Sequence, residues 1–258
     1  MLSVDLNCDM GESSPLWSYN IEKDLELLQY ISSVNLACGY HAGDPETMKR
    51  ITEAGLKNNI AIGAHPSFPD LKNFGRNEMH FNPGQIAEMV MAQISVLHKI
   101  VQPMGGKLHH VKPHGALYNM AAKDDTMAKA ICKAIIDLDS SIIIYGLSGS
   151  ALISAGAAMG LETCSEVFAD RTYQDNGSLT PRTSAQALIS NISTAASQVL
   201  RMIQKAIVVS ISGNEIPILA ETICIHGDAP NAVHFSKEIN QLLLQNGVEI
   251  RAKRGKID

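Results

Sequence analysis

The chain has 258 residues, of which 45% are hydrophobic and 18% are charged, a composition typical of a folded globular protein. Its formal net charge of −5 argues against nucleic acid or an anionic membrane surface as a partner. The sequence contains no apolar run long enough to span a bilayer and no secretory signal at its N-terminus. The 5 cysteines are odd in number and widely spaced, which favours reduced thiols and a cytoplasmic location.

Short apolar strands alternate along the chain with segments of helical periodicity. Asp44-Pro45 and Asn82-Pro83 each combine a capping side chain with a proline suited to the first helical position. The predicted strands span residues 4–9, 32–38, 60–65, 108–112, 142–145, 162–168 and 221–226. The helices expected between and after them span residues 21–30, 45–57, 85–101, 125–138, 184–205 and 231–244, with shorter ones starting near 116 and ending near 160.

This order gives seven strand-then-helix units and one insertion. The insertion is a β-hairpin near residues 207–219, where Gly213-Asn214 separates two apolar runs. Alternating units of this kind imply a parallel sheet with helices packed against it. We predict a single domain over residues 1–258, folded as a seven-stranded parallel β/α barrel. An open Rossmann-like sheet is the alternative.

The distribution of polar residues favours the closed barrel. Almost all the candidate site residues fall at or just after the end of a predicted strand: Asp9, His41, His65, Lys112, His114, Asp170, Arg171, His226 and Asp228. In a β/α barrel, the C-terminal ends of all strands surround one mouth, where catalytic groups are placed. The first strand also alternates, with Asp5, Asn7 and Asp9 on one face. We expect that face to line the site.

The stretch 109–119 carries the densest chemistry in the sequence. Side chains on a strand alternate between faces, so His110, Lys112 and, if the strand continues, His114 share one face. Lys112 precedes a proline and is therefore expected to be extended. The alternative is an ordinary polar strand end with a solvated lysine.

The residues of the predicted mouth allow two kinds of chemistry. Their imidazoles and carboxylates suffice to bind a divalent metal, although no local spacing signature marks a metal site. The same groups can act as general acids and bases, since histidine titrates near neutrality. Lys112 and Arg171 can bind a carboxylate or stabilise an oxyanion. Residues 146–150 precede a helix and could bind an anion, but an ordinary helix cap is the more common use of such a turn.

Six motifs resemble those of a known family. They are DLNCDMGE at 5–12, NLACGYHAGD at 35–44, GAHPSFPD at 63–70, VKPHGALYN at 111–119, EVFADR at 166–171 and TICIHGD at 222–228. In the same order, over about residues 4–250, they resemble the LamB/YcsF family of 5-oxoprolinase A subunits. The resemblance implies a barrel like that of the glycoside hydrolase/deacetylase superfamily.

The resemblance also implies an activity: ATP-dependent opening of 5-oxo-L-proline (pyroglutamate) to L-glutamate, performed with 5-oxoprolinase subunits B and C. ATP would act through the complex, and a divalent metal or a homo-oligomer is compatible with it. The expected catalytic residues are Asp9, His65, Lys112 and His114. The expected substrate-binding residues are Asn7, His41, Glu166, Arg171, His226 and Asp228. The alternatives are a metal-dependent amide hydrolase or deacetylase acting alone, and a non-catalytic subunit that presents substrate.

Overall fold

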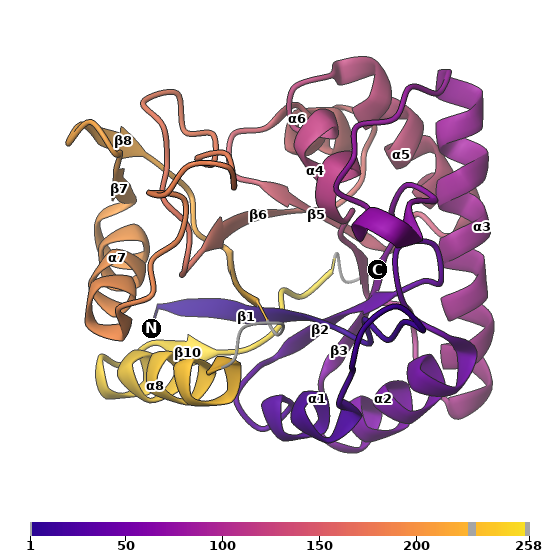
Figure 1. Ribbon diagram of the computed structural model, residues 1–258, viewed down its shortest axis with the longest axis horizontal. Helices are drawn as coiled ribbons and strands as arrows, with labels where there is room; N and C mark the ends of the chain where they lie inside the picture. The colour runs from indigo at the N-terminus through magenta and orange to yellow at the C-terminus, as the bar shows by residue number, and fades with distance from the viewer. Residues whose placement is uncertain (1, 227–230, 256–258) are drawn as a thin grey trace.

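Seven parallel strands close into a barrel (Figure 1). The computed structural model describes residues 2–226 and 231–255, and of His226 only the backbone. The barrel strands are β1 (Ser3–Met10), β2 (Ser33–Ala37), β3 (Ala61–His65), β4 (His110–Val111), β5 (Ile143–Leu147), β6 (Thr163–Phe168) and β9 (Thr222–His226). Each pairs with the next, and β9 pairs with both β6 and β1. The predicted seven-stranded parallel barrel is confirmed, and the open sheet is wrong.

Helices surround the barrel on its outer side (Figure 1). They are α1 (Ile21–Leu27), α2 (Pro45–Lys57), α3 (Pro83–Val101), α4 (Gly115–Ala121), α5 (Asp125–Leu138), α6 (Ala151–Ala158), α7 (Ile192–Lys205) and α8 (Ala232–Gln245), with short 3-10 turns η1 (Leu71–Asn73) and η2 (Gln102–Met104). The Asp44 and Asn82 side chains cap α2 and α3 as predicted. No helix among residues 2–226 and 231–255 is long and apolar enough to cross a membrane.

The predicted helix over residues 184–205 is wrong in its first part. Helix α7 begins at Ile192, and the side chain of Asn191 caps it. The preceding residues fold back on the loop that follows β6, where Ile189 N–H donates a 2.8 Å hydrogen bond to the Asp170 carbonyl. Tertiary hydrogen bonds therefore override the local helical preference of this segment.

The insertion and the chain end complete the fold. Strands β7 (Ile207–Val209) and β8 (Glu215–Pro217) form the predicted antiparallel hairpin. The sequence did not predict β10 (Glu249–Ile250), which pairs in parallel with the start of β1. Beyond β10, the Lys253 ammonium lies 2.6 Å from Glu221 and 3.2 Å from Glu162. The C-terminal segment is thereby anchored across the N-terminal ends of the strands, which we call the floor of the barrel.

The two faces of β1 explain how the barrel is filled. Val4, Leu6 and Cys8 point outward and belong to the apolar core. Asp5 and Asn7 point inward and are almost completely buried. Because each buried polar group needs a partner, the interior is hydrogen-bonded from strand to strand. The Asp5 carboxylate accepts hydrogen bonds from hydroxyls of Ser32, Ser33 and Thr222 at 2.6–2.7 Å.

Candidate active site

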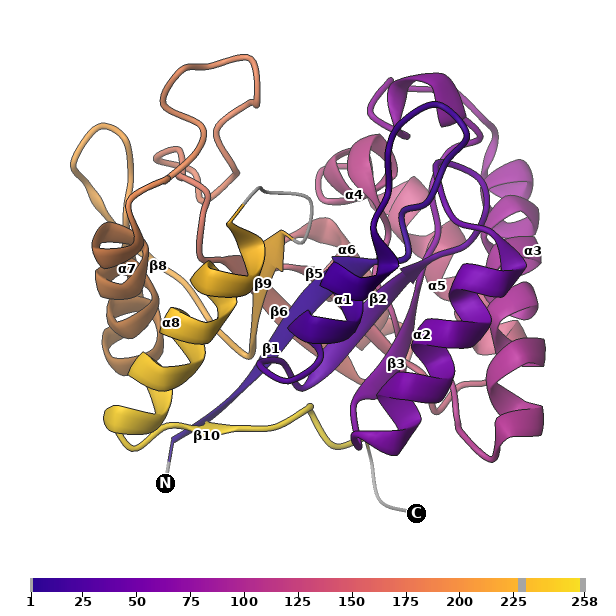
Figure 2. The ribbon, with the colours of Figure 1, turned by 60° about the horizontal axis from the view of Figure 1, so that its bottom comes forward.

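A cleft of about 850 Å³ opens at the C-terminal ends of the strands. Figure 2 shows the loops after β3 and β6 rising on the same side of the barrel. The predicted residues Asp9, His65, Lys112, His114 and Arg171 all line the cleft, with Asn7 and Glu166 buried in the barrel interior and His41 buried beside His114. The backbone of His226 ends β9 opposite Asp9. The side chain of His226 and the whole of Asp228 lie outside the described residues.

Lys112 occupies the centre of the barrel. Its ammonium lies 2.8 Å from Asp9 Oδ1 and 2.8 Å from Glu166 Oε1, with Asn7 Oδ1 at 3.2 Å and Cys224 Sγ at 3.1 Å. Burial alone would lower the pKa of Lys112, but the surrounding negative groups raise it well above the ordinary value. Lys112 is therefore a fixed cation and does not serve as a base. The alternative of a solvated lysine is wrong, since only 2% of the side chain is exposed.

Asp9 connects this cation to the cleft. Its Oδ1 atom accepts a 2.8 Å hydrogen bond from the Asn35 amide as well as the bond from Lys112. Its Oδ2 atom lies 3.3 Å from Nε2 of His65. A carboxylate held by a buried ammonium and an amide stays ionised and correctly oriented. Asp9 can therefore act as a base or orient an adjacent histidine.

Two further histidines extend the site from His65. His65 Nδ1 lies 2.7 Å from the Lys112 carbonyl, and His114 Nε2 lies 2.9 Å from the Phe74 carbonyl. The other nitrogens of these rings, His65 Nε2 and His114 Nδ1, are 3.0 Å apart. The ring of His41 stacks on His114 at 3.8 Å, nearly parallel. Burial and the neighbouring rings lower the pKa of His41 and of His114 well below the ordinary value, so both are neutral.

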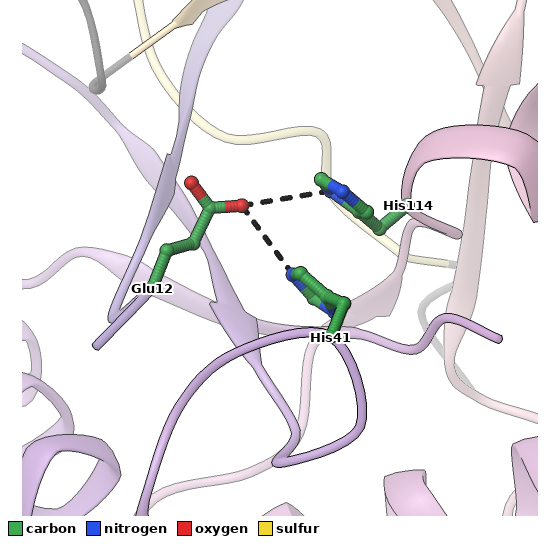
Figure 3. A group of neighbouring side chains, drawn as sticks. All are labelled: Glu12, His41 and His114. Atoms are coloured by element: carbon green, nitrogen blue, oxygen red, sulfur yellow. Dashed lines mark hydrogen bonds and ion pairs between the residues drawn. The ribbon is translucent and has the colours of Figure 1, made fainter. Parts of the chain in front are cut away.

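Glu12 is a site residue that the sequence analysis did not select. Its Oε1 atom lies 3.4 Å from His41 Nε2 and 3.5 Å from His114 Nδ1 (Figure 3). It closes the group that we call the mouth cluster: Asp9, Glu12, His41, His65, Lys112 and His114. Glu12 belongs to the loop after β1, and the only signal for it was its place at the end of the first family motif.

Glu166 lies below the cleft in a second hydrogen-bonded group. It accepts hydrogen bonds from the Tyr118 hydroxyl at 2.7 Å and the Asn7 amide at 3.0 Å, besides its contact with Lys112. Burial and the neighbouring carboxylate raise the pKa of Tyr118 well above the ordinary value, so it stays a donor. The sequence analysis also missed Tyr118, which α4 carries into the barrel. Tyr118 thus supplies a hydrogen-bond donor to the buried Glu166 carboxylate. The contact of Glu166 with substrate stays a prediction.

Arg171 organises the wall of the cleft. It donates hydrogen bonds to the carbonyls of Thr180 at 2.6 Å and Ala187 at 3.2 Å. Burial lowers the pKa of Arg171 to about 10, so the guanidinium remains charged near neutrality. The arginine thus fixes the loop after β6, while its predicted substrate contact stays a prediction. Ser150, which also lines the cleft, caps α6, the ordinary use predicted for that turn.

These features define a class of protein. The chain is a β/α barrel whose strand ends carry a buried cluster of carboxylates, imidazoles and one ammonium, an arrangement characteristic of enzyme active sites. Residues 4–257 match the LamB/YcsF family, and the chain belongs to that family. The resemblance predicted from the motifs is therefore confirmed.

The similar proteins cover nearly the whole chain. A protein of Geobacillus kaustophilus, named as the A subunit of 5-oxoprolinase, is 50% identical over 254 residues, covering 98% of each chain. A relative of the same name from Bordetella parapertussis is 48% identical over 250 residues, covering 97% of this chain and 98% of the relative. The solved lactam utilization protein from Thermus thermophilus superposes with a TM-score of 0.90 at 37% identity, covering 98% of this chain and 100% of that chain.

Proposed function

We propose that this chain is the A subunit of an ATP-dependent 5-oxoprolinase and that it opens 5-oxo-L-proline to L-glutamate together with subunits B and C. The observation that carries the proposal is the mouth cluster, in which Asp9 is held ionised beside His65 at the bottom of a cleft. The names of the relatives supply the substrate class. The five cysteines are buried and unbridged, which fits the reducing cytoplasm in which we place the enzyme.

A five-membered lactam is a stable amide, so its ring carbonyl must be activated before water can attack it. We assign this activation to phosphorylation of the ring oxygen by ATP, supplied through the partner subunits. Asp9, or one of the mouth histidines, would then take a proton from the attacking water. The Lys112 ammonium lies 2.8 Å from both Asp9 and Glu166. Its positive charge would keep the Asp9 carboxylate ionised. The ring nitrogen would leave with the proton from that water as the C–N bond breaks, which gives γ-glutamyl phosphate. A second water would then hydrolyse the acyl phosphate to L-glutamate and phosphate.

The surroundings of the cleft support the division of labour. The sequence has no glycine-rich phosphate-binding motif. Cationic side chains nevertheless lie on the cleft walls, namely Arg76, Lys123, Arg171 and Arg182. Such groups can bind the phosphate of an activated ring delivered from a partner, or hold the carboxylate of 5-oxoproline. A volume of about 850 Å³ leaves room for a partner segment beside a small lactam.

The test is reconstitution. The purified chain, subunits B and C, and the three together are each incubated with 5-oxoproline and ATP, and glutamate is measured. We expect turnover only in the three-subunit mixture. Equal turnover by the chain alone would contradict the assignment of ATP chemistry to the partners and favour a hydrolase acting alone. Full activity of a mixture containing Asp9→Asn would instead favour a subunit that only presents substrate.

A further inference from the structure

Hydrogen bonds to carbonyl oxygens fix which nitrogen carries the proton in two of the mouth histidines. A carbonyl only accepts, so His65 Nδ1–H donates to Lys112 O at 2.7 Å and His114 Nε2–H donates to Phe74 O at 2.9 Å. In the neutral rings, His65 Nε2 and His114 Nδ1 therefore carry lone pairs. These two atoms face each other at 3.0 Å, and neither neutral ring has a proton to place between them.

Further electron-pair donors surround these nitrogens. Asp9 Oδ2 lies 3.3 Å from His65 Nε2, and Glu12 Oε1 lies 3.5 Å from His114 Nδ1. Glu12 Oε1 also lies 3.4 Å from His41 Nε2 (Figure 3). The His41 side chain is fully buried, and its Nδ1 atom has no hydrogen-bond partner among the described residues. Two carboxylates and three imidazoles thus gather around one small volume.

The spacing of these atoms fits a coordination shell. With metal–ligand bonds of about 2.0–2.2 Å, neighbouring ligand atoms of a tetrahedral zinc site are about 3.3–3.6 Å apart, and those of a six-coordinate site are closer. The separation is 3.0 Å between His65 and His114, 3.4 Å between His41 and Glu12 and 3.5 Å between His114 and Glu12. The rings of His41 and His114 stack nearly parallel at 3.8 Å, so one of them must turn for both lone pairs to point at the same ion. The Lys112 ammonium offsets the charge of Asp9, and a cation held by the imidazoles and Glu12 would stabilise the remaining lone pairs.

We propose that Glu12, His41 and His114 bind one divalent transition-metal cation, with zinc as the preferred ion and His65 as the adjacent fourth ligand. The ligand atoms of the first three residues all lie within 4.8 Å of one another. Imidazole and carboxylate donors together suit zinc and similar ions better than magnesium or calcium, which prefer oxygen-only shells. When bound, such an ion supplies Lewis acidity to an amide oxygen or a water molecule in the cleft.

A proton is the competing occupant. A proton on His114 Nδ1 would join that atom to His65 Nε2, and a neutral His41 could separately donate its Nε2–H to Glu12 Oε1 at 3.4 Å. A cation in the middle of the group satisfies all these contacts at once. The two occupants make different demands on Glu12: a metal needs its oxygen as a ligand, whereas a proton between the two rings does not.

The experiment measures metal binding without substrate, so its outcome does not depend on the proposed 5-oxoprolinase activity. The full chain is freed of metal with a chelator and then titrated calorimetrically with Zn²⁺, Co²⁺ and Mg²⁺. We expect one Zn²⁺ or Co²⁺ per chain, a visible absorption band for bound Co²⁺, and much weaker binding of Mg²⁺. Because a ligand that binds only the folded state stabilises it, Zn²⁺ should also raise the melting temperature.

The key variant is Glu12→Gln, which keeps the size of the side chain and removes the charge. Zn²⁺ affinity should fall by at least about 100-fold, the upper end of the effect of changing a residue that only orients a ligand. His80→Asn is the matched control, since His80 is exposed and does not line the cleft. Its Zn²⁺ affinity should equal that of the wild type.

Folding of the variants is checked by their melting temperatures in the presence of chelator. His41→Asn serves as the second ligand variant and should also lose the Co²⁺ absorption band. No Zn²⁺ binding by the wild-type chain, or equal Zn²⁺ affinity in the wild type and a folded Glu12→Gln, would overturn the proposal. Loss of binding in His80→Asn would overturn it as well, because it would place the ion elsewhere.

Discussion

The barrel contains two histidine pairs of nearly the same geometry, one at the mouth and one at the floor. At the floor, His109 Nε2 lies 2.8 Å from the Lys253 carbonyl and His110 Nε2 lies 2.7 Å from Asn35 Oδ1. Both of these nitrogens therefore donate, and the two Nδ1 atoms face each other at 3.0 Å. The separation equals that between His65 Nε2 and His114 Nδ1 at the mouth. We call His109 and His110 the floor pair.

The difference between the pairs lies in the charges around them. Among the described residues, no carboxylate forms an ion pair with either ring of the floor pair. The buried carboxylate in the lower half of the barrel, Asp5, accepts hydrogen bonds from three hydroxyls instead. At the mouth, Glu12 and Asp9 contact the imidazoles directly. The floor pair therefore has no such carboxylate to balance, whereas the mouth carboxylates are balanced by the buried Lys112 and, as proposed, by a bound cation.

The largest expected effect concerns the charge balance at the mouth. Lys112→Met would leave the Asp9 and Glu166 carboxylates buried without their cation, and removing one partner of a buried ion pair costs about 3–5 kcal/mol. We expect the free energy of unfolding, measured by urea denaturation, to fall by that amount. Lys129→Met is the control, because Lys129 pairs with Asp125 on an exposed helix surface and should change stability by less than about 1 kcal/mol. Equal losses in both variants would refute this account of Lys112.

The next effect separates the two ends of β1. Asp9→Asn should retain the fold and lower the rate of the three-subunit reaction by at least about 100-fold, the scale of a general base or its orienting group. Asp5→Asn, the matched change at the floor, removes an acceptor from buried hydroxyls. It should cost about 1–3 kcal/mol of stability while the rate per folded molecule stays within a few-fold of the wild type. Activity and unfolding are measured on the same preparations. A fully active Asp9→Asn would break the distinction between mouth and floor.

Much of this arrangement could be predicted from the sequence, because the period of β1 and the strand ends depend only on local pattern. Asp9, His65, Lys112 and His114 follow from strands that end in polar residues, and barrel closure brings them together. The place of Glu12 could not be predicted in the same way. It lies in a loop, and its approach to His41 depends on the tertiary path of that loop.

The same limit applies to the segment before α7 and to Arg171. Residues 184–191 have no local feature that forbids a helix, yet hydrogen bonds to the loop after β6 hold them in turns. Arg171 looked like a free cation at a strand end, and the structure shows two backbone carbonyls accepting from it. In both cases, the decisive partners are distant in the sequence or belong to an irregular loop, where pattern carries little information.

The smallest effect tests the floor pair through pH. Burial lowers the pKa of His109, and it lowers that of His110 well below the ordinary value, so both rings are neutral in the folded state. In the unfolded chain, each ring takes up a proton as the pH falls through the ordinary value of about 6.5. The unfolded state then binds more protons, so the free energy of unfolding should decrease with acidification below that pH.

Each such histidine contributes at most about 1.4 kcal/mol per pH unit to this slope. His109→Gln removes one titrating ring, and its slope between about pH 6.5 and 5.5 should be shallower than that of the wild type by up to that amount. His234→Gln, at a histidine whose side chain is 63% exposed, should leave the slope unchanged. Urea denaturation at each pH, in the presence of chelator, measures all three proteins. An equal slope in His109→Gln and the wild type would mean that the floor pair keeps a shared proton in the folded state, and the floor would then resemble the mouth in needing a positive charge.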